Sequence, residues 1–294
     1  MTVLSEGKTK RIIAGPRKGT VLLQAKDTLT GGDAAVRAEI NQIGAAKTRQ
    51  AAKTMGLLAR CGIPTAFIEQ QGDIALLCDQ CEMLPLEFVV RRYAWGSFLK
   101  RRPDFSQTQP YRFDQPLWEI FHKDSVVIPP HVPAPEQMTE NQAREKFLTQ
   151  EGWLEGVYTD PYSVCEADGW HLYSAKAPIK GTPLMTIAPV LKADELRQII
   201  DQIVLPAFLA LEEAWGQIET TYGPVHLVDI KFEMGRRARD QALVMADVVD
   251  NDSWRIWPGG DPKRQLDKQC FRDGESLASV EQNYEIVTRL TEKF

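Results

Sequence analysis

The feature that most constrains this chain is a run at positions 226–235, HLVDIKFEMG, in which charged and apolar residues alternate. Side chains of a β-strand point to its two faces in turn. As a strand, the run places Asp229, Lys231 and Glu233 on one face and the apolar residues between them on the other. Such a strand needs a core against one face and carries a row of charge on the other.

A second acidic stretch, MADVVDNDSWR, follows the turn-like segment GRRARDQ. The spacing predicts a β-hairpin in which Glu233 pairs with Asp247, so that two carboxylates share one face. Neighbouring carboxylates repel each other unless a cation lies between them, and Mg²⁺ prefers carboxylate and phosphate oxygens. The hairpin therefore indicates either a magnesium–nucleotide site or a solvent-facing hairpin of alternating charge, which is common in antiparallel sheets.

Composition excludes several classes of function. The chain has 294 residues and a formal net charge of -5, which gives no reason to expect a nucleic-acid partner. No apolar run approaches the roughly 20 residues that span a membrane, and the N-terminus lacks the apolar core of a signal peptide. Five cysteines, an odd number, fit reduced thiols and a cytoplasmic location. Cys78 and Cys81 form a CxxC without a second pair of zinc ligands, so no zinc site is expected there.

Periodicity predicts a mixture of helices and short strands. The first 90 residues contain apolar strand-like runs around one helix over 38–60. Further helices are expected over 140–149, over 196–215 with an interruption at Pro206, and over 276–294. The intervening segment 125–189 is rich in proline and tryptophan and is the hardest to assign.

Six ordered blocks of sequence point to a known family. They are EGKTKRI, DTLTGGDAA, CEMLPLEFVVRRYAWGSFLKRRP, HLVDIKFEMG, MADVVDNDSWRIWPGGD and LDKQCFRD. Their identity and order resemble the SAICAR synthetases, the phosphoribosylaminoimidazole-succinocarboxamide synthases of purine synthesis. The resemblance implies an α+β fold with two lobes that grip ATP, built from antiparallel sheets with flanking helices and similar to ATP-grasp enzymes and kinases. It implies a β-rich nucleotide-binding lobe over 1–82 and a lobe with the metal and substrate site over 83–294.

The same resemblance implies an ATP-dependent ligase. Enzymes of this family phosphorylate the carboxylate of carboxyaminoimidazole ribonucleotide (CAIR), and the amine of L-aspartate then attacks the acyl phosphate to give SAICAR, ADP and phosphate. Phosphorylation supplies a leaving group, while Mg²⁺ and lysines neutralise the charge of the transferring group. Small-molecule substrates are thus the expected partners. The family includes monomers and larger assemblies, so a homo-oligomer is compatible with the sequence.

Matching motifs suggest roles in binding ATP and metal. Lys8 and Lys10 lie on one face of the expected first strand and would contact ATP phosphates. Without the resemblance, the two residues would be interpreted as exposed lysines on an edge strand. Backbone groups of Glu82, Met83 and Leu84 would bind adenine between the lobes.

In the hairpin, the family pattern assigns Mg²⁺ to Glu233 and Asp247. Lys231 would face the phosphate or the activated carboxylate. Asp229 would orient that lysine, or it could simply help to solvate the strand.

Other matching residues suggest a ribonucleotide site. Arg91 and Ser97 flank a Gly-Ser turn that suits a phosphate, whereas Arg101 and Arg102 read as solvated surface. Asp252 and Arg255 belong to the family's DSxR unit, although Asp252 could instead cap a turn. Lys268 and Arg272 match the last block, and we expect them to bind substrate.

The chain departs from the family pattern after residue 120. The usual acidic pair and nearby Asp-Pro are replaced by a block that runs from Phe121 through Lys123 to Ser125, and the next Asp-Pro comes only at Asp160. Lys123 could still reach an ATP phosphate as a catalytic residue. The segment 125–189 is expected to be an insertion or lid, and it leaves open a paralogous ATP-dependent amide ligase or small-molecule kinase with another acid or amine substrate.

Overall fold

The computed structural model describes residues 2–31, 36–123, 126–127, 140–149, 152–153, 157–166, 168–268, 271, 274 and 276–294. The chain divides into two compact units, a first unit of Met1–Leu84 with Ile199–Phe294 and a second unit of Pro85–Gln198. This division differs from the expected 1–82 and 83–294. Residues from 199 onward join the N-terminal ones because their helices and strands pack against helix α1 (Ile43–Arg60) and the segment that follows it.

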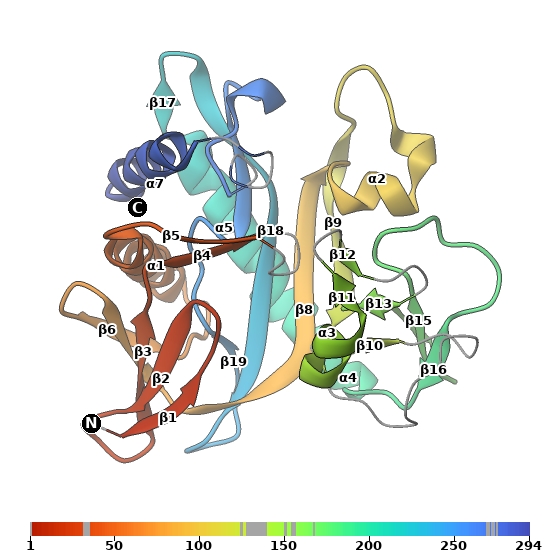
Figure 1. Ribbon diagram of the computed structural model, residues 1–294, viewed down its shortest axis with the longest axis horizontal. Helices are drawn as coiled ribbons and strands as arrows, with labels where there is room; N and C mark the ends of the chain where they lie inside the picture. The colour runs from red at the N-terminus through yellow and green to blue at the C-terminus, as the bar shows by residue number, and fades with distance from the viewer. Residues whose placement is uncertain are drawn as a thin grey trace. The chain divides into compact units, whose positions relative to one another are not determined.

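The first unit is built around antiparallel strands with three main helices (Figure 1). Besides α1, its elements are β1 (Val3–Glu6), β2 (Lys10–Ala14), β3 (Thr20–Ala25), β4 (Thr28–Gly31), β5 (Val36–Glu39), β6 (Phe67–Gln71), β7 (Ala75–Asp79), η2 (Ile200–Val204), α5 (Leu205–Gly216), β17 (Glu219–Thr220), β18 (Gly223–Arg237), β19 (Leu243–Ala246), β20 (Trp254–Pro258), η3 (Pro262–Arg264) and α7 (Leu277–Thr291). Strand β8 (Cys81–Tyr93) begins in this unit and continues into the second.

Five strands of the first unit form one sheet in the order β1-β2-β3-β7-β6. All neighbours are antiparallel, and β2 faces β3 with Lys10 opposite Ala25 and Ile12 opposite Leu23. Apolar residues of β3 and β7 are buried, which explains why these two strands are the central ones of the sheet.

Helix α1 begins at Ile43, five residues later than the sequence predicted, because residues 36–39 pair with β4 instead. Its first turn is capped from a distance: the Asp27 side chain accepts a hydrogen bond from the Gly44 N–H at 2.9 Å. A carboxylate at a helix N-terminus satisfies a free N–H group and interacts well with the helix dipole. The helix therefore begins at the place where Asp27, shortly after the end of β3, presents its carboxylate.

Strand β18 has the predicted two-faced character on its apolar side. Val228, Ile230 and Phe232 are fully buried, and burial of each side chain stabilises the fold by about 1.5–3 kcal/mol. Helix α5 packs against β18 and buries Phe208 and Leu211. The expected interruption near Pro206 takes the form of the five-residue π-helical segment η2, directly before α5. A π turn widens the backbone spacing where proline cannot donate the usual hydrogen bond.

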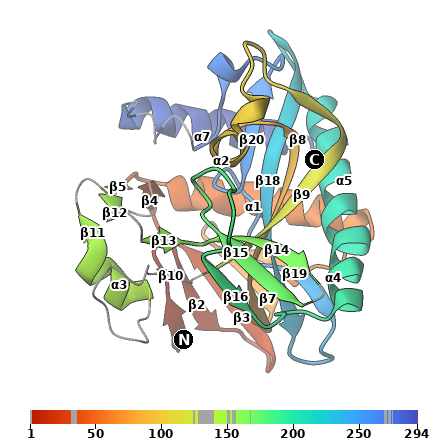
Figure 2. The same ribbon diagram turned by 90° about the vertical axis from the view of Figure 1, so that its right-hand side faces the viewer.

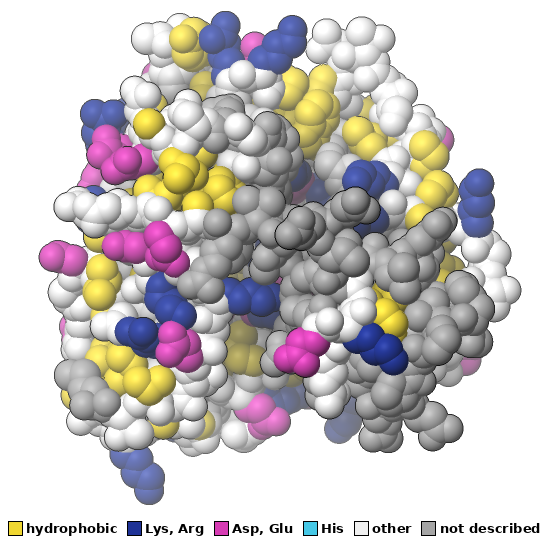
Figure 3. Space-filling model, in the orientation of Figure 1, with side chains coloured by type: hydrophobic (Ala, Val, Ile, Leu, Met, Phe, Trp, Pro, Cys, Tyr) yellow, Lys and Arg dark blue, Asp and Glu magenta, His cyan; other side chains and the backbone are white. Residues whose placement is uncertain are grey.

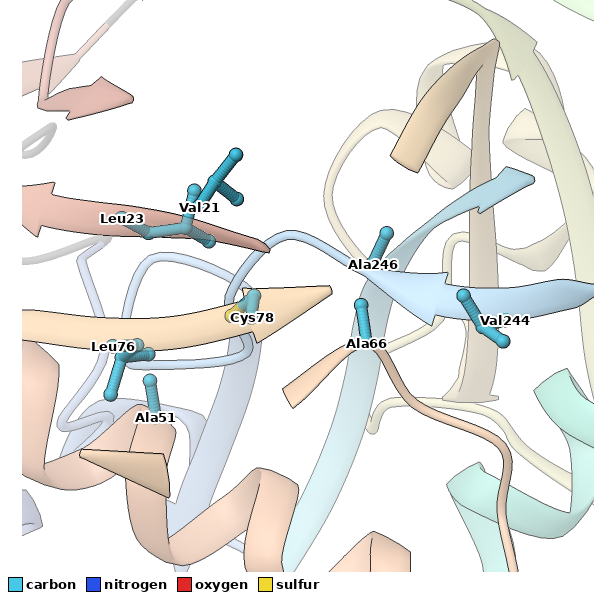
Figure 4. Close-up of a cluster of buried hydrophobic side chains, with 8 residues drawn as sticks. All are labelled: Val21, Leu23, Ala51, Ala66, Leu76, Cys78, Val244 and Ala246. Atoms are coloured by element: carbon cyan, nitrogen blue, oxygen red, sulfur yellow. The ribbon is translucent and has the colours of Figure 1, made fainter. Parts of the chain in front are cut away.

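A small apolar cluster links β19 to the sheet and to α1 (Figure 4). Its buried members are Val21, Leu23, Ala51, Ala66, Leu76, Cys78, Val244 and Ala246. The link is reinforced by backbone hydrogen bonds on both sides of Met245, from its N–H to Pro64 and from Ala66 N–H to its carbonyl. The end of β19 is thereby fixed against the first unit's core.

The second unit contains an antiparallel sheet in the order β8-β9-β14-β15-β16 and short flanking elements. Its elements are α2 (Ser97–Arg101), η1 (Pro103–Phe105), β9 (Arg112–His122), β10 (Val126–Val127), α3 (Glu140–Phe147), β11 (Leu148–Thr149), β12 (Gly152–Trp153), β13 (Tyr158–Thr159), β14 (Tyr162–Glu166), β15 (Gly169–Tyr173), β16 (Met185–Ile187) and α4 (Ala193–Ile199). The short helix expected over 140–149 is confirmed as α3.

On the face drawn in Figure 3, the basic side chains of the described residues are interspersed with acidic and apolar ones. Within the described part of the chain, no helix combines the length and the apolarity that crossing a membrane requires.

Helices α1 and α7 lie side by side (Figure 2), and a buried glutamine joins them. The Gln50 amide donates to the Tyr284 carbonyl at 3.0 Å and to the Thr288 hydroxyl at 2.9 Å, and its oxygen accepts from the Asn251 N–H at 3.0 Å. The predicted C-terminal helix is confirmed as α7, which begins after Ser276, whose hydroxyl accepts from the Ser279 N–H. One side chain thus connects two helices and the loop after β19.

Replacement of Gln50 by alanine should lower the free energy of unfolding by about 3 kcal/mol, because it leaves buried polar groups unsatisfied and creates a cavity. Urea denaturation measures the change. The matched control is Gln70→Ala, since Gln70 is an exposed glutamine on β6 whose amide donates to the nearby Gly72 carbonyl. The control should change stability by less than about 0.5 kcal/mol. Equal effects of the two variants would contradict this account.

Candidate active site

The charged row expected on β18 is present. Asp229 and Glu233 are only 8% and 7% exposed, and the Lys231 ammonium lies 3.1 Å from a Glu233 carboxylate oxygen. Two buried carboxylates need compensating partners, because an isolated charge is costly to remove from water. This burial rules out the reading of the hairpin as a simple solvent-facing one.

The expected pairing of Glu233 with Asp247 is wrong by one residue. Glu233 lies opposite Ala246, and Asp247 follows directly after the end of β19 with a left-handed backbone, φ 63°. The cause is the turn, where left-handed Gln241 donates to the Arg237 carbonyl at 2.8 Å and closes the loop one residue early. Both carboxylates still come from neighbouring chain segments, so the donor set remains suitable for Mg²⁺.

Lys10 starts β2, and its ammonium pairs with a carboxylate oxygen of Asp247. Lys8 does not share a strand face with it: Lys8 is exposed in the bend between β1 and β2, because β1 ends at Glu6. The Lys10–Asp247 pair lies beside Cys78. Burial, and to a smaller extent the negative charge of Asp247, raise the pKa of the Cys78 thiol to about 12. Burial also raises the pKa of Cys81 to about 11, so both thiols stay protonated at neutral pH.

Arg255 lies opposite Asp229 in the register between β18 and β20, and the two side chains form a salt bridge. The Arg255 Nε atom is buried without a hydrogen-bond partner among the described residues. A buried guanidinium donor without a partner is a place where a ligand oxygen can bind.

Asp252 is the centre of a buried ionic cluster. Its carboxylate receives the Lys47 ammonium at 2.8 Å, the Lys268 ammonium at 3.2 Å and the Tyr284 hydroxyl. Burial alone would raise the pKa of Asp252, but the charges of Lys47 and Lys268 outweigh it and hold the pKa well below its usual range. Asp252 is therefore a link between α1, α7 and the segment before residue 269, and not simply the cap of a turn.

Asp250 lies beside this cluster and behaves in the opposite way. Burial, and then the Asp252 charge, raise the pKa of Asp250 to about 6. Its Oδ1 atom accepts the Asp252 N–H at 2.8 Å, which fixes the loop between the two residues. The loop therefore contains one carboxylate that stays charged and one that takes up a proton near neutral pH.

Sequence reasoning missed Lys47, Asp250 and Tyr284. A signal for Lys47 was present, because it occupies the buried stripe of α1 at helical spacing from Ile43 and from Leu58. A lysine at an apolar position of a helix needs a buried partner. No comparable local pattern marked Tyr284 or Asp250.

The segment Glu82, Met83 and Leu84 is where the chain passes from the first unit to the second. Glu82 and Met83 are exposed, whereas Leu84 is buried. Gly235 of β18 allows a close approach here, since a Cβ atom at this position would lie 2.9 Å from Cys81 Cβ and 3.1 Å from the Glu82 carbonyl oxygen. The backbone of this segment is thus packed tightly on one side and open on the other.

In the second unit, Arg91 belongs to a buried triad. Arg91 and Arg101 both bond to Glu119, each to a different carboxylate oxygen, and all three side chains are nearly inaccessible. Arg101 is therefore not solvated surface, as the sequence suggested: its guanidinium lies over the rings of Phe121 and Tyr162. Two cations share one anion, which leaves a net positive charge that suits an anionic group.

The remaining expected residues are less closely grouped. Ser97 begins α2 after Gly96, whose φ of 61° makes the expected turn. Lys123 follows β9, is half-buried, and donates its N–H to the Pro85 carbonyl at 2.8 Å. Arg272 lies outside the described residues.

The raised pKa of Asp250 predicts a pH-dependent stability. Between pH 4 and 6 the folded chain holds a proton on Asp250 that the unfolded chain, with a pKa near 3.9, releases. The free energy of unfolding should therefore fall, by on the order of 1–3 kcal/mol, as pH rises from about 4 to 7. Asp250→Asn mimics the protonated form and should remove this fall and be more stable than wild type at pH 8. Urea denaturation at several pH values tests it, and an unchanged slope in the variant would refute the assignment.

The chain is similar to known proteins of one family along nearly its whole length. The SAICAR synthetase family model matches residues 3–152 and 181–290. A phosphoribosylaminoimidazole-succinocarboxamide synthase of Herpetosiphon aurantiacus is 34% identical over 100% of this chain and 98% of its own length. Its counterpart in Chloroflexus aggregans is 35% identical over 98% of this chain and 95% of its own length.

A solved structure shows the same fold. A SAICAR synthetase in complex with ADP has a TM-score of 0.67 at 24% identity, covering 98% of this chain and 97% of its own. The expected α+β fold with antiparallel sheets and flanking helices is confirmed. From the family match, the near-complete coverage of its relatives and the shared fold, we conclude that the chain belongs to the SAICAR synthetase family.

Proposed function

We propose that the protein is an ATP-dependent ligase that joins L-aspartate to CAIR, with SAICAR, ADP and phosphate as products. The observation that carries the proposal is the set of charges on the β18–β19 hairpin and β2, where Lys10 pairs with Asp247 and Lys231 with Glu233. The relatives that bear this activity in their names cover nearly the whole chain. Another acid or amine substrate is not favoured, since the family match includes the blocks on both sides of the atypical segment.

The paired charges have a chemical use. Glu233 and Asp247 are hard oxygen donors, and they would hold Mg²⁺, which neutralises charge on ATP phosphates. Lys10 and Lys231, now bound to those carboxylates, would turn to the phosphates of the nucleotide, with Lys8 at the exposed bend nearby in sequence. Backbone groups of Glu82, Met83 and Leu84 would bind the adenine ring.

The reaction needs positioning more than covalent help from the protein. An oxygen of the CAIR carboxylate attacks the γ-phosphorus and ADP leaves, which gives an acyl phosphate. The aspartate amine then attacks the acyl carbon, phosphate leaves, and the amine loses a proton. Lys231 would stabilise the negative charge of the transferring phosphoryl group, and Asp229, anchored by Arg255, fixes the strand position of that lysine.

Each unit offers polar groups that suit the ribonucleotide. Arg91 and Ser97 offer a guanidinium and a hydroxyl for its phosphate, and Lys123 is an additional cation of the same unit. Arg255 offers its buried Nε donor. Asp252, held by Lys268 and Lys47, would orient the loop that carries Arg255, and Arg272 belongs to the same proposed group.

The first test is ADP release by the purified protein with Mg-ATP and CAIR, with and without L-aspartate. We expect ADP and SAICAR to form in equal amounts and only when L-aspartate is present. L-Glutamate and L-asparagine serve as matched amines that differ by one methylene or one charge. ADP release without SAICAR, or turnover only with another amine, would refute the proposed substrate pair.

The second prediction concerns Asp247→Asn. Asparagine tolerates a left-handed backbone, so the variant should fold and lose less than about 1 kcal/mol of stability. It removes a carboxylate ligand, and kcat should fall about 100-fold or more. The matched control is Asp240→Asn in the turn of the same hairpin, where Asp240 pairs with Arg237. Steady-state kinetics should show nearly normal kcat for the control, and normal kcat in a folded Asp247→Asn variant would contradict the metal assignment.

A further inference from the structure

A second group of metal-ligand side chains lies in the second unit and shares no residue with the site described above. Glu166, Asp168 and His171 belong to the hairpin formed by β14 and β15, and one ligand atom of each lies within 4.8 Å of the others. We propose that these three side chains bind a divalent transition-metal ion, with Zn²⁺ as the best match.

The histidine is oriented for this role. His171 lies opposite Thr186 in the register between β15 and β16, and its Nδ1 atom is 2.9 Å from the Thr186 hydroxyl oxygen. This hydrogen bond fixes the orientation of the ring, and when Nδ1 donates to the hydroxyl oxygen the other nitrogen keeps a lone pair for a metal. That other atom, Nε2, is the one that faces the two carboxylates.

The distances fit a shared ion better than direct hydrogen bonds. His171 Nε2 lies 3.4 Å from an Asp168 oxygen and 3.8 Å from a Glu166 oxygen. An N–H···O hydrogen bond prefers about 2.9 Å. Two ligands that each lie about 2.1 Å from a tetrahedral Zn²⁺ are roughly 3.4 Å apart. The spacing of His171 Nε2 and the Asp168 oxygen is therefore that of two ligands around one small cation, and the Glu166 oxygen lies slightly farther away.

The charges of the two carboxylates also favour a bound cation. Glu166 and Asp168 bring two negative charges together, and in the described part of the chain neither of them pairs with a lysine or arginine. Their side chains are 59% and 76% exposed, so an ion can enter and can keep water in its remaining coordination position.

The donor set selects among ions. One imidazole nitrogen with two carboxylates suits Zn²⁺ and its neighbours in the first transition row, whereas Mg²⁺ prefers oxygen alone. Cys165 precedes Glu166 on the strand and points to the opposite face.

The hairpin provides a fixed frame for these side chains. Glu166 and Gly169 face each other at its end, and β15 is paired on its other side with β16. Gly169 permits that pairing at close range, because a Cβ atom there would lie 2.9 Å from Thr186 Cγ2. The glycine thus brings the Thr186 strand close, and His171 gains its partner.

The test is isothermal titration of the full chain with Zn²⁺ in excess Mg²⁺, which occupies sites made of oxygen alone. Wild type should bind one Zn²⁺ that His171→Asn and Asp168→Asn do not bind, and Thr186→Val should weaken this binding about 10-fold. The matched control is Asp73→Asn, an exposed carboxylate in the β6–β7 hairpin turn without a histidine. It should bind Zn²⁺ as wild type does. Circular dichroism checks that each variant is folded.

A spectroscopic readout separates this site from others. Cu²⁺ added to wild type in one equivalent should show coupling to an imidazole nitrogen in its electron paramagnetic resonance spectrum, and His171→Asn should abolish the coupling. Wild type that binds no Zn²⁺, or a folded His171→Asn variant that binds it with unchanged affinity and stoichiometry, would overturn the proposal. Neither readout depends on ligase activity, so the outcome is independent of the proposed function.

Discussion

The buried carboxylate of Asp252 is the constraint on which the first unit most depends. A charge removed from water must be paired. The partners of Asp252 are Lys47 on α1, Tyr284 on α7 and Lys268, which follows η3. The loop that carries Asp252 runs from Asp247 to Ser253, and Arg255 follows on β20. The geometry of Asp247 and Arg255, both proposed site residues, therefore rests on this ionic cluster.

Local features of this protein could be predicted from the sequence, and long-range ones could not. Alternation along β18 and the Ser276 start of α7 depend on neighbouring residues, and both were predicted correctly. The partners of Lys47 and Gln50 lie more than 200 positions away, and composition says nothing about them. The hairpin register was missed by one residue because a left-handed Gln241 shortened the turn, and glutamine carries no signal for that backbone.

In the second unit, too, the sequence did not predict which charged side chain is buried. Arg101 and Arg102 are adjacent in sequence, yet Arg101 is buried on Glu119 while Arg102 pairs with Asp104 at the surface. Arg101 also donates to the carbonyl of Ala175 at 2.7 Å, and Ala175 belongs to the stretch 153–180, which lies outside the family match. The hairpin with Glu166 and His171 belongs to the same stretch. The proposed metal site of this chain therefore lies in a stretch that the family model does not match.

The π-helical segment η2 constrains how many residues the chain can have before α5. A π turn holds one residue more than an α-helical turn, so one deletion within Ile200–Val204 could restore regular α-helix without rotating α5, whereas a second deletion would turn the following part by about 100°. Phe208 and Leu211 would then leave the apolar face of β18, and the strand that carries the charged row would lose its support. Evolution of this helix is consequently freer to exchange its residues than to change their number.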